Sequence, residues 1–128
     1  MAHTFLYRRR RALLTTCVLL WLTAFAVTHT PSSELPHFSV GDKTLHVVGF
    51  FGLGGIFILT LVAYRMATLR RIVLVALAMM IYAGLDELTQ PYFGRTADLL
   101  DWVSDMGGTT LAIILCESTF ALFLKKTT

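Results

Sequence analysis

Most of the acidic residues of this chain lie in one short stretch. Residues 86–105, DELTQPYFGRTADLLDWVSD, hold five of the eight aspartates and glutamates. Asp98, Asp101 and Asp105 recur at helical spacing, so an α-helix would place them on one face. Glu87 and Gln90 share a face in the same way, whereas Asp86 points elsewhere. Carboxylates are costly in lipid, so we expect them to face a bundle interior or water. The alternative is that the helix ends early and that both acids at its end are simply solvated.

An aspartate and a histidine precede this stretch. Asp42 and His46 are four residues apart and would share one helix face. Imidazole titrates near neutral pH, so His46 oriented by Asp42 is a candidate general acid or base, with Glu87 as the second such group. The alternative is a helix-capping aspartate and an interfacial histidine.

The remaining polar residues are candidates for binding. Lys43 or Arg95 would hold an anionic headgroup, although pairing of Arg95 with the acidic face is the alternative. Hard divalent cations favour oxygen ligands, so Glu87, Asp101 and Asp105 are candidate metal ligands, and a divalent cation is the one candidate cofactor. The full candidate ligand-binding set is Lys43, Gln90, Arg95, Asp98, Asp101 and Asp105.

Apolar segments must position these residues. The mean hydropathy is +0.68, and only 15% of residues are charged, against about a quarter in soluble domains. A bilayer core needs about 20 helical residues per span. We predict an all-α, polytopic transmembrane four-helix bundle in one domain, residues 1–128, with spans at about 12–28, 44–64, 72–90 and 97–124. Pro91 should end the third span.

Basic residues give the orientation. Nine of the eleven fall on one side of the predicted spans. By the positive-inside rule both termini lie in the cytoplasm and the acidic stretch faces outward from the inner membrane. The basic clusters should hold anionic lipid headgroups. Nucleic-acid binding is not expected, because no folded module follows the arginine run at 8–11.

Several buried residues carry separate expectations. The first span ends in a signal-like AFA, but its long apolar run and Trp21 favour a retained helix over a cleaved signal. Glu117 lies deep in the fourth span without an obvious basic partner, so we expect a protonated, packed carboxyl. Cys17 and Cys116 should be small buried hydrophobes. Gly108 continues the acidic face as a stripe of small residues suited to helix packing.

Two segments, DKTLHVVGFFGLG and DELTQPYFGRTADLLDWVSDMGG, together resemble the VanZ-like family of small integral membrane proteins with about four spans. The resemblance covers residues 42–112. Positions similar to the family's hallmark polar set are Asp42, Lys43, His46, Glu87, Gln90, Arg95, Asp101 and Asp105, with a glycine at Gly108. Ala112 and Gly107 depart from the pattern. The resemblance implies a cell-envelope role, and the family's namesake gives low-level resistance to the glycopeptide antibiotic teicoplanin.

Two classes of function follow from these residues. In the first, the polar faces of the last three spans converge in a pocket at the outer membrane face. That pocket binds a lipid headgroup, a lipid-linked envelope precursor, an antibiotic or a partner protein without turnover, serves ion passage, or serves only to fix the helices. In the second, a membrane-embedded enzyme modifies a lipid-linked or phospho-headgroup substrate, with His46 and Glu87 as acid and base.

Overall fold

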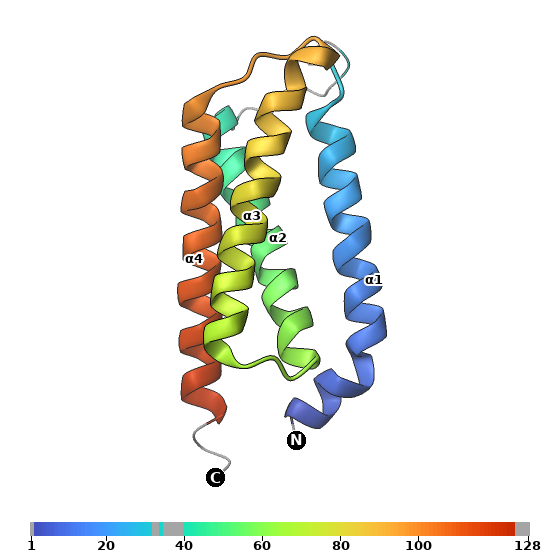
Figure 1. Ribbon diagram of the computed structural model, residues 1–128, viewed down its shortest axis with the longest axis vertical. Helices are drawn as coiled ribbons and strands as arrows, with labels where there is room; N and C mark the ends of the chain where they lie inside the picture. Colours follow the sequence, from blue (N-terminus) through green and yellow to red (C-terminus); the bar gives the residue numbers. More distant parts are fainter. Residues whose placement is uncertain (1, 32–33, 35–39, 125–128) are drawn as a thin grey trace.

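The computed structural model describes residues 2–31, 34 and 40–124, and this part of the chain contains four long α-helices and no strand. They are α1 (Ala2–Thr28), α2 (Asp42–Ala63), α3 (Thr68–Thr89) and α4 (Leu99–Leu124), with the short 3-10 helix η2 (Gln90–Phe93) after α3. The helices run along one long axis, and the start of α1 and the end of α4 lie at the same end (Figure 1). We call this the near end and the opposite one the far end. The predicted all-α four-helix bundle is confirmed.

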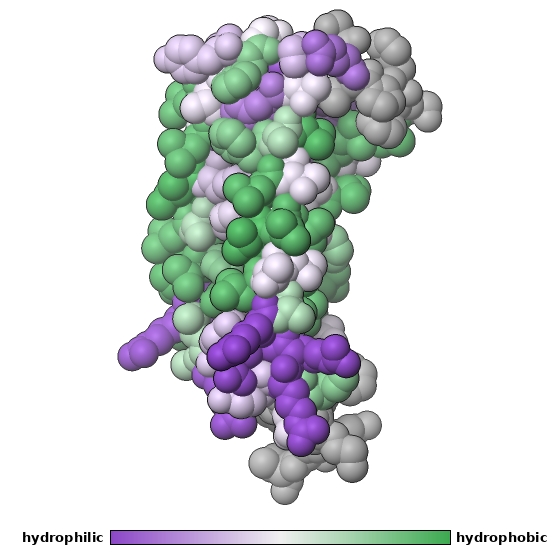
Figure 2. Space-filling model, turned by 90° about the vertical axis from the view of Figure 1, so that its right-hand side faces the viewer, coloured by the Kyte–Doolittle hydropathy of each residue, from purple (hydrophilic) through white to green (hydrophobic). Residues whose placement is uncertain are grey.

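Each helix is long and apolar enough to cross a membrane, over Thr4–Thr28, Asp42–Ala63, Thr68–Phe93 and Leu99–Leu122. The chain is therefore a multi-pass membrane protein. Figure 2 shows a mostly hydrophobic middle with hydrophilic residues gathered at both ends of the visible face. The helices follow the predicted spans except that α1 starts well before residue 12, because arginine is a good helix former and residues 8–11 continue the helix. Before Pro91 α3 ends as predicted, and the chain tightens into η2.

Small residues set the approach of α2 to α4. A Cβ at Gly108 would clash with the backbone of Val47 and Phe51 on α2. A Cβ at Gly54 would lie 3.3 Å from the Cβ of Ala112. The small stripe predicted on the fourth span is thus the surface that packs against α2, and it holds the polar residues of the two helices in register.

The first helix packs on the bundle through Trp21. Its ring lies 5.3 Å from that of Phe57 and 4.9 Å from that of Tyr82. The Tyr82 hydroxyl donates to the Trp21 carbonyl at 3.0 Å. Cys17 is buried on the same helix and, like Cys116 on α4, is a free thiol. These contacts make α1 an integral part of the bundle.

Candidate functional site

Three helices bring charged side chains together at the far end. One ring nitrogen of His46 on α2 and one carboxylate oxygen each of Glu87 on α3 and Asp105 on α4 all lie within 4.8 Å of one another. Their residues are only 9%, 6% and 0% exposed. The three polar faces therefore converge as the spacing predicted. We call His46, Glu87, Asp101 and Asp105 the far-end cluster.

His46 takes its hydrogen-bond partner from the facing helix. Its Nδ1 lies 2.8 Å from Asp105 Oδ1, and its Nε2 lies 3.8 Å from Asp101 Oδ2. The expectation that Asp42 orients the imidazole was wrong. Asp42 occupies the exposed first turn of α2, whereas Asp105 is fully buried directly across from His46. Asp42 still lies near enough to form a second group with His46 and Asp101.

Glu87 ties the start of α4 to the end of α3. Its Oε2 accepts a hydrogen bond from the backbone N–H of Asp98 at 2.8 Å. The Asp98 Oδ1 in turn accepts from the backbone N–H of Leu100 at 2.8 Å, as a helix cap does. One carboxylate oxygen of Glu87 is therefore engaged in fixing the turn, and the other is left for the cluster.

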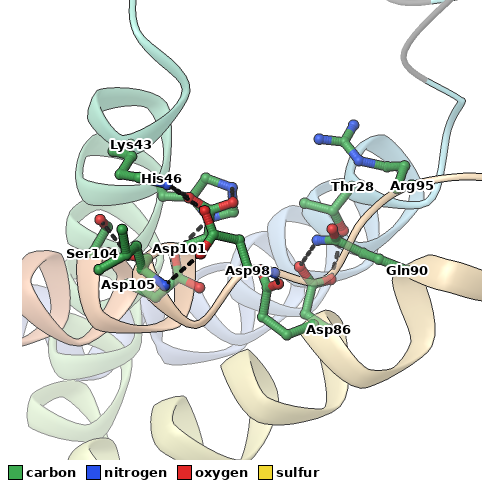
Figure 3. Close-up of polar contacts among 12 residues, drawn as sticks. Thr28, Lys43, His46, Asp86, Gln90, Arg95, Asp98, Asp101, Ser104 and Asp105 are labelled. Carbon is green, nitrogen blue, oxygen red and sulfur yellow. Dashed lines mark hydrogen bonds and ion pairs between the residues drawn. The ribbon is translucent and has the colours of Figure 1, made fainter.

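Lys43 is the cation that neutralises the acidic face of α4. Its Nζ donates to Asp98 Oδ2 and to Asp101 Oδ1, both at 2.7 Å (Figure 3). These bonds, with the Leu100 N–H, hold the pKa of Asp98 below its ordinary value. The sequence suggested Arg95 for this role, which was wrong. Among the described residues, the Arg95 side chain has one hydrogen bond, to the Thr30 carbonyl at 3.5 Å, because the turn after η2 directs it toward the end of α1.

The far-end cluster holds more negative charge than its neighbours compensate. Lys43 is shared by Asp98 and Asp101, so within the described part of the chain His46 is the nearby group that can balance Glu87 and Asp105. Glu87 Oε1 and Asp105 Oδ2 are buried, and neither has a hydrogen-bond partner among the residues that the structure describes. Leaving buried carboxylate oxygens unsatisfied is costly. The cluster therefore has unused capacity for a cation or a hydrogen-bond donor.

The structure groups the candidate metal ligands differently from the set expected from the sequence. Glu87 and Asp105 converge with His46 rather than with Asp101, while Asp101 lies with Asp42 and His46. The sequence interpretation considered oxygen ligands alone and missed the histidine nitrogen. The arrangement could hold a metal through one nitrogen and two carboxylates, or carry out acid–base chemistry through the His46–Asp105 pair.

Asp86 and Gln90 form a separate group against α1. Asp86 Oδ1 accepts a hydrogen bond from the Thr28 hydroxyl at 2.5 Å, and its Oδ2 accepts from Gln90 Nε2 at 3.0 Å (Figure 3). The expectation that Gln90 lies beside Glu87 was wrong. Gln90 instead bonds Asp86, four residues before it, and Asp86 faces α1. Asp86 points away from α2 as predicted. The alternative that Asp86 and Glu87 are solvated was wrong, since they are 1% and 6% exposed.

His29 belongs to this second group and was missed. It is 7% exposed. Its Nε2 lies 2.7 Å from the Thr89 hydroxyl and its Nδ1 lies 2.7 Å from the Phe25 carbonyl. The sequence could have indicated only the contact with Phe25, which is four residues away and therefore one helical turn back. Thr89, the other partner, is 60 residues away along the chain. With Thr28, His29 joins the end of α1 to the end of α3.

The near end contains a complete ion pair. Arg71 donates through Nε to Glu117 Oε1 at 2.6 Å and through Nη2 to Oε2 at 2.5 Å. Its Nη1 donates to the Met66 carbonyl at 2.7 Å. The expectation that Glu117 is a protonated carboxyl without a basic partner was wrong. Because α3 begins at Thr68, Arg71 lies in the first turn of this helix and reaches Glu117 on α4, although the sequence had assigned Arg71 to a loop. We call these two residues the near-end pair.

Comparison with known proteins gives no further identification of these sites. Neither a protein-family model, nor a curated protein, nor a solved structure matches the chain. Function is therefore argued from the geometry of the far-end cluster, because a site is a stronger warrant than a fold.

Proposed function

We propose that this protein is a VanZ-like protein of the cell envelope that binds the headgroup of a lipid or a lipid-linked precursor at the far end of its bundle. Glycopeptide resistance is the envelope role that the resemblance implies. The observation that carries the proposal is the buried Glu87 and Asp105, each with one carboxylate oxygen that no described residue pairs with. A membrane protein that keeps such costly groups gains from them through a partner.

The depth of the cluster suits a headgroup. His46 is four residues after the start of α2, and Asp105 is six residues after the start of α4. At about 1.5 Å per residue, these positions lie roughly 6 and 9 Å along the helices from their ends. That is the zone in which headgroups meet acyl chains. Lys43, half exposed above the cluster, would attract a phosphate.

We further propose that the far end faces outward from the cytoplasmic membrane, following the arginines gathered at the near end. Cysteine labelling in intact cells tests this, with both native cysteines replaced by alanine. Thr96→Cys in the exposed far-end turn should react with a membrane-impermeant maleimide, and Ala67→Cys at the near end should react only after permeabilisation. The reverse pattern would contradict the proposed orientation.

Ligand binding can be measured on purified protein in dodecylmaltoside micelles, with undecaprenyl phosphate as the probe. We expect saturable binding that falls at least tenfold in Glu87→Gln and His46→Ala. Ser104→Ala is the matched control, because its hydroxyl bonds only the Leu100 carbonyl of its own helix. Equal binding by all four proteins would reject the cluster as the binding site.

A second candidate function is enzymatic. The observation that favours it is the buried His46–Asp105 contact at 2.8 Å, in which a carboxylate fixes one nitrogen of a histidine, as in many acid–base sites. Release of inorganic phosphate from undecaprenyl diphosphate by purified protein would support this function if His46→Ala abolished it. Absence of turnover with retained binding would leave binding as the function.

A further inference from the structure

We propose that the far-end cluster binds one divalent transition-metal ion, held by a ring nitrogen of His46 and by carboxylate oxygens of Glu87 and Asp105. This inference rests on the proposed function, because it concerns the same cluster. It identifies a metal ion as the group that neutralises the negative charge of the cluster. The bound ion would present a positive charge to an anionic headgroup.

The geometry is close to that of a metal centre. The three donor atoms come from three different helices and lie within 4.8 Å of one another. Metal–nitrogen and metal–oxygen bonds of about 2.0–2.2 Å place neighbouring ligand atoms about 3–4 Å apart. Small side-chain rotations therefore complete the site without moving a helix.

The unpaired oxygens are the second, independent indication of a ligand. Glu87 Oε1 and Asp105 Oδ2 are buried, and no described residue donates to either. Their residues are 6% and 0% exposed. A single ion is small enough to sit between these buried oxygens, and through such an ion the cluster can hold an anionic headgroup. An ion would supply the positive charge that Lys43 gives to Asp98 and Asp101 but not to these two.

The donor set selects the class of ion. Calcium and magnesium prefer oxygen ligands throughout, whereas an imidazole nitrogen with carboxylates suits zinc, manganese or iron. The alternative group of Asp42, His46 and Asp101 is a weaker candidate. Asp42 is exposed, and Asp101 already accepts a hydrogen bond from Lys43.

The test is titration calorimetry of the full chain in dodecylmaltoside, purified without a histidine tag, stripped with chelator and titrated with zinc chloride or manganese chloride alone. We expect one ion per chain for at least one metal. Affinity should fall more than tenfold in Glu87→Gln and in Asp105→Asn, and remain unchanged in Ser104→Ala. Both isosteric variants keep an oxygen that can accept the bond from Asp98 or His46. Absence of saturable binding, or equal affinity in all variants, would overturn the inference.

The same preparation separates this inference from the proposed function. Undecaprenyl phosphate is added to stripped and to metal-loaded protein. Metal binding without phosphate binding would reject the proposed function and support the metal site. The opposite result is that metal titration gives no heat and that undecaprenyl phosphate binds equally with and without added metal. That result would support the proposed function and overturn the metal site.

Discussion

The two ends of this bundle bury charge in opposite ways. At the near end, Arg71 and Glu117 meet through two hydrogen bonds, and a backbone carbonyl takes the remaining guanidinium arm. At the far end, carboxylates from α3 and α4 surround one histidine from α2, and two buried oxygens have no hydrogen-bond partner among the described residues. A complete pair can serve packing alone. The far-end cluster instead keeps capacity for a cation or a hydrogen-bond donor, and this difference is the basis of the proposed binding site.

The largest expected effect comes from removing the acid of the near-end pair. Glu117→Leu leaves a buried arginine without its counter-ion, and removing one partner of a buried pair costs about 3–5 kcal/mol. We expect about 3 kcal/mol lower free energy of unfolding in a dodecyl sulfate titration. The double variant Arg71→Met/Glu117→Leu should recover most of the loss. A loss below about 1 kcal/mol in the single variant would show that the pair is not structural.

The next test acts on the approach of α2 to α4, which the far-end cluster requires. Gly108→Ala places a methyl group against the backbone of Val47 and Phe51, so we expect a loss of about 2 kcal/mol and weaker metal binding. Gly107→Ala is the matched control, because a Cβ there meets nothing within 4 Å. It should be neutral or slightly stabilising. Equal effects of the two substitutions would reject the packing explanation.

A smaller effect is expected when one acid of the far-end cluster is neutralised. Asp105→Asn removes a buried charge but keeps an oxygen that can accept from His46, so stability without ligand should change by less than about 1 kcal/mol, in the stabilising direction. The same titration measures it. A loss as large as that of Glu117→Leu would mean that the far-end cluster is as structural as the near-end pair.

The smallest effect concerns the exposed edge of the far end. Lys43→Met removes the partner that lowers the pKa of Asp98, so that pKa should rise toward its ordinary value. Because the pKa of Asp98 is lower in the folded than in the unfolded protein, its ionised form stabilises the fold at pH values above the unfolded pKa. This stabilisation is lost as the pH falls through the folded pKa. The variant should therefore show a weaker acid dependence of stability. Carbon-13 NMR titration of Asp98 measures the shift, and an unchanged pKa would contradict the Lys43 assignment.

Helix periodicity made much of this architecture predictable. The four spans, the shared face of Asp101 and Asp105 and the packing role of Gly108 all follow from spacing within single helices. Asp101 and Asp105 were also expected to meet His46, because in an up-and-down bundle the starts of α2 and α4 lie at the same end. Local spacing therefore carried the fold and the location of the site.

Pairing between helices was not predictable in this way. Arg71 and Glu117 are 46 residues apart, and His46 and Asp105 are 59 apart. The rotation of each helix about its axis decides which of several acids a base meets, and that rotation depends on side-chain packing along the whole bundle. For this reason Asp42 was expected where Asp105 lies, and Arg95 where Lys43 lies.

The most direct test of the contrast between the two ends is anomalous diffraction at the zinc absorption edge, from crystals of the full chain prepared with zinc chloride. We predict one peak enclosed by His46, Glu87 and Asp105, and none beside Arg71 and Glu117. An empty far end, with Glu87 and Asp105 hydrogen-bonded directly to each other, would contradict the account.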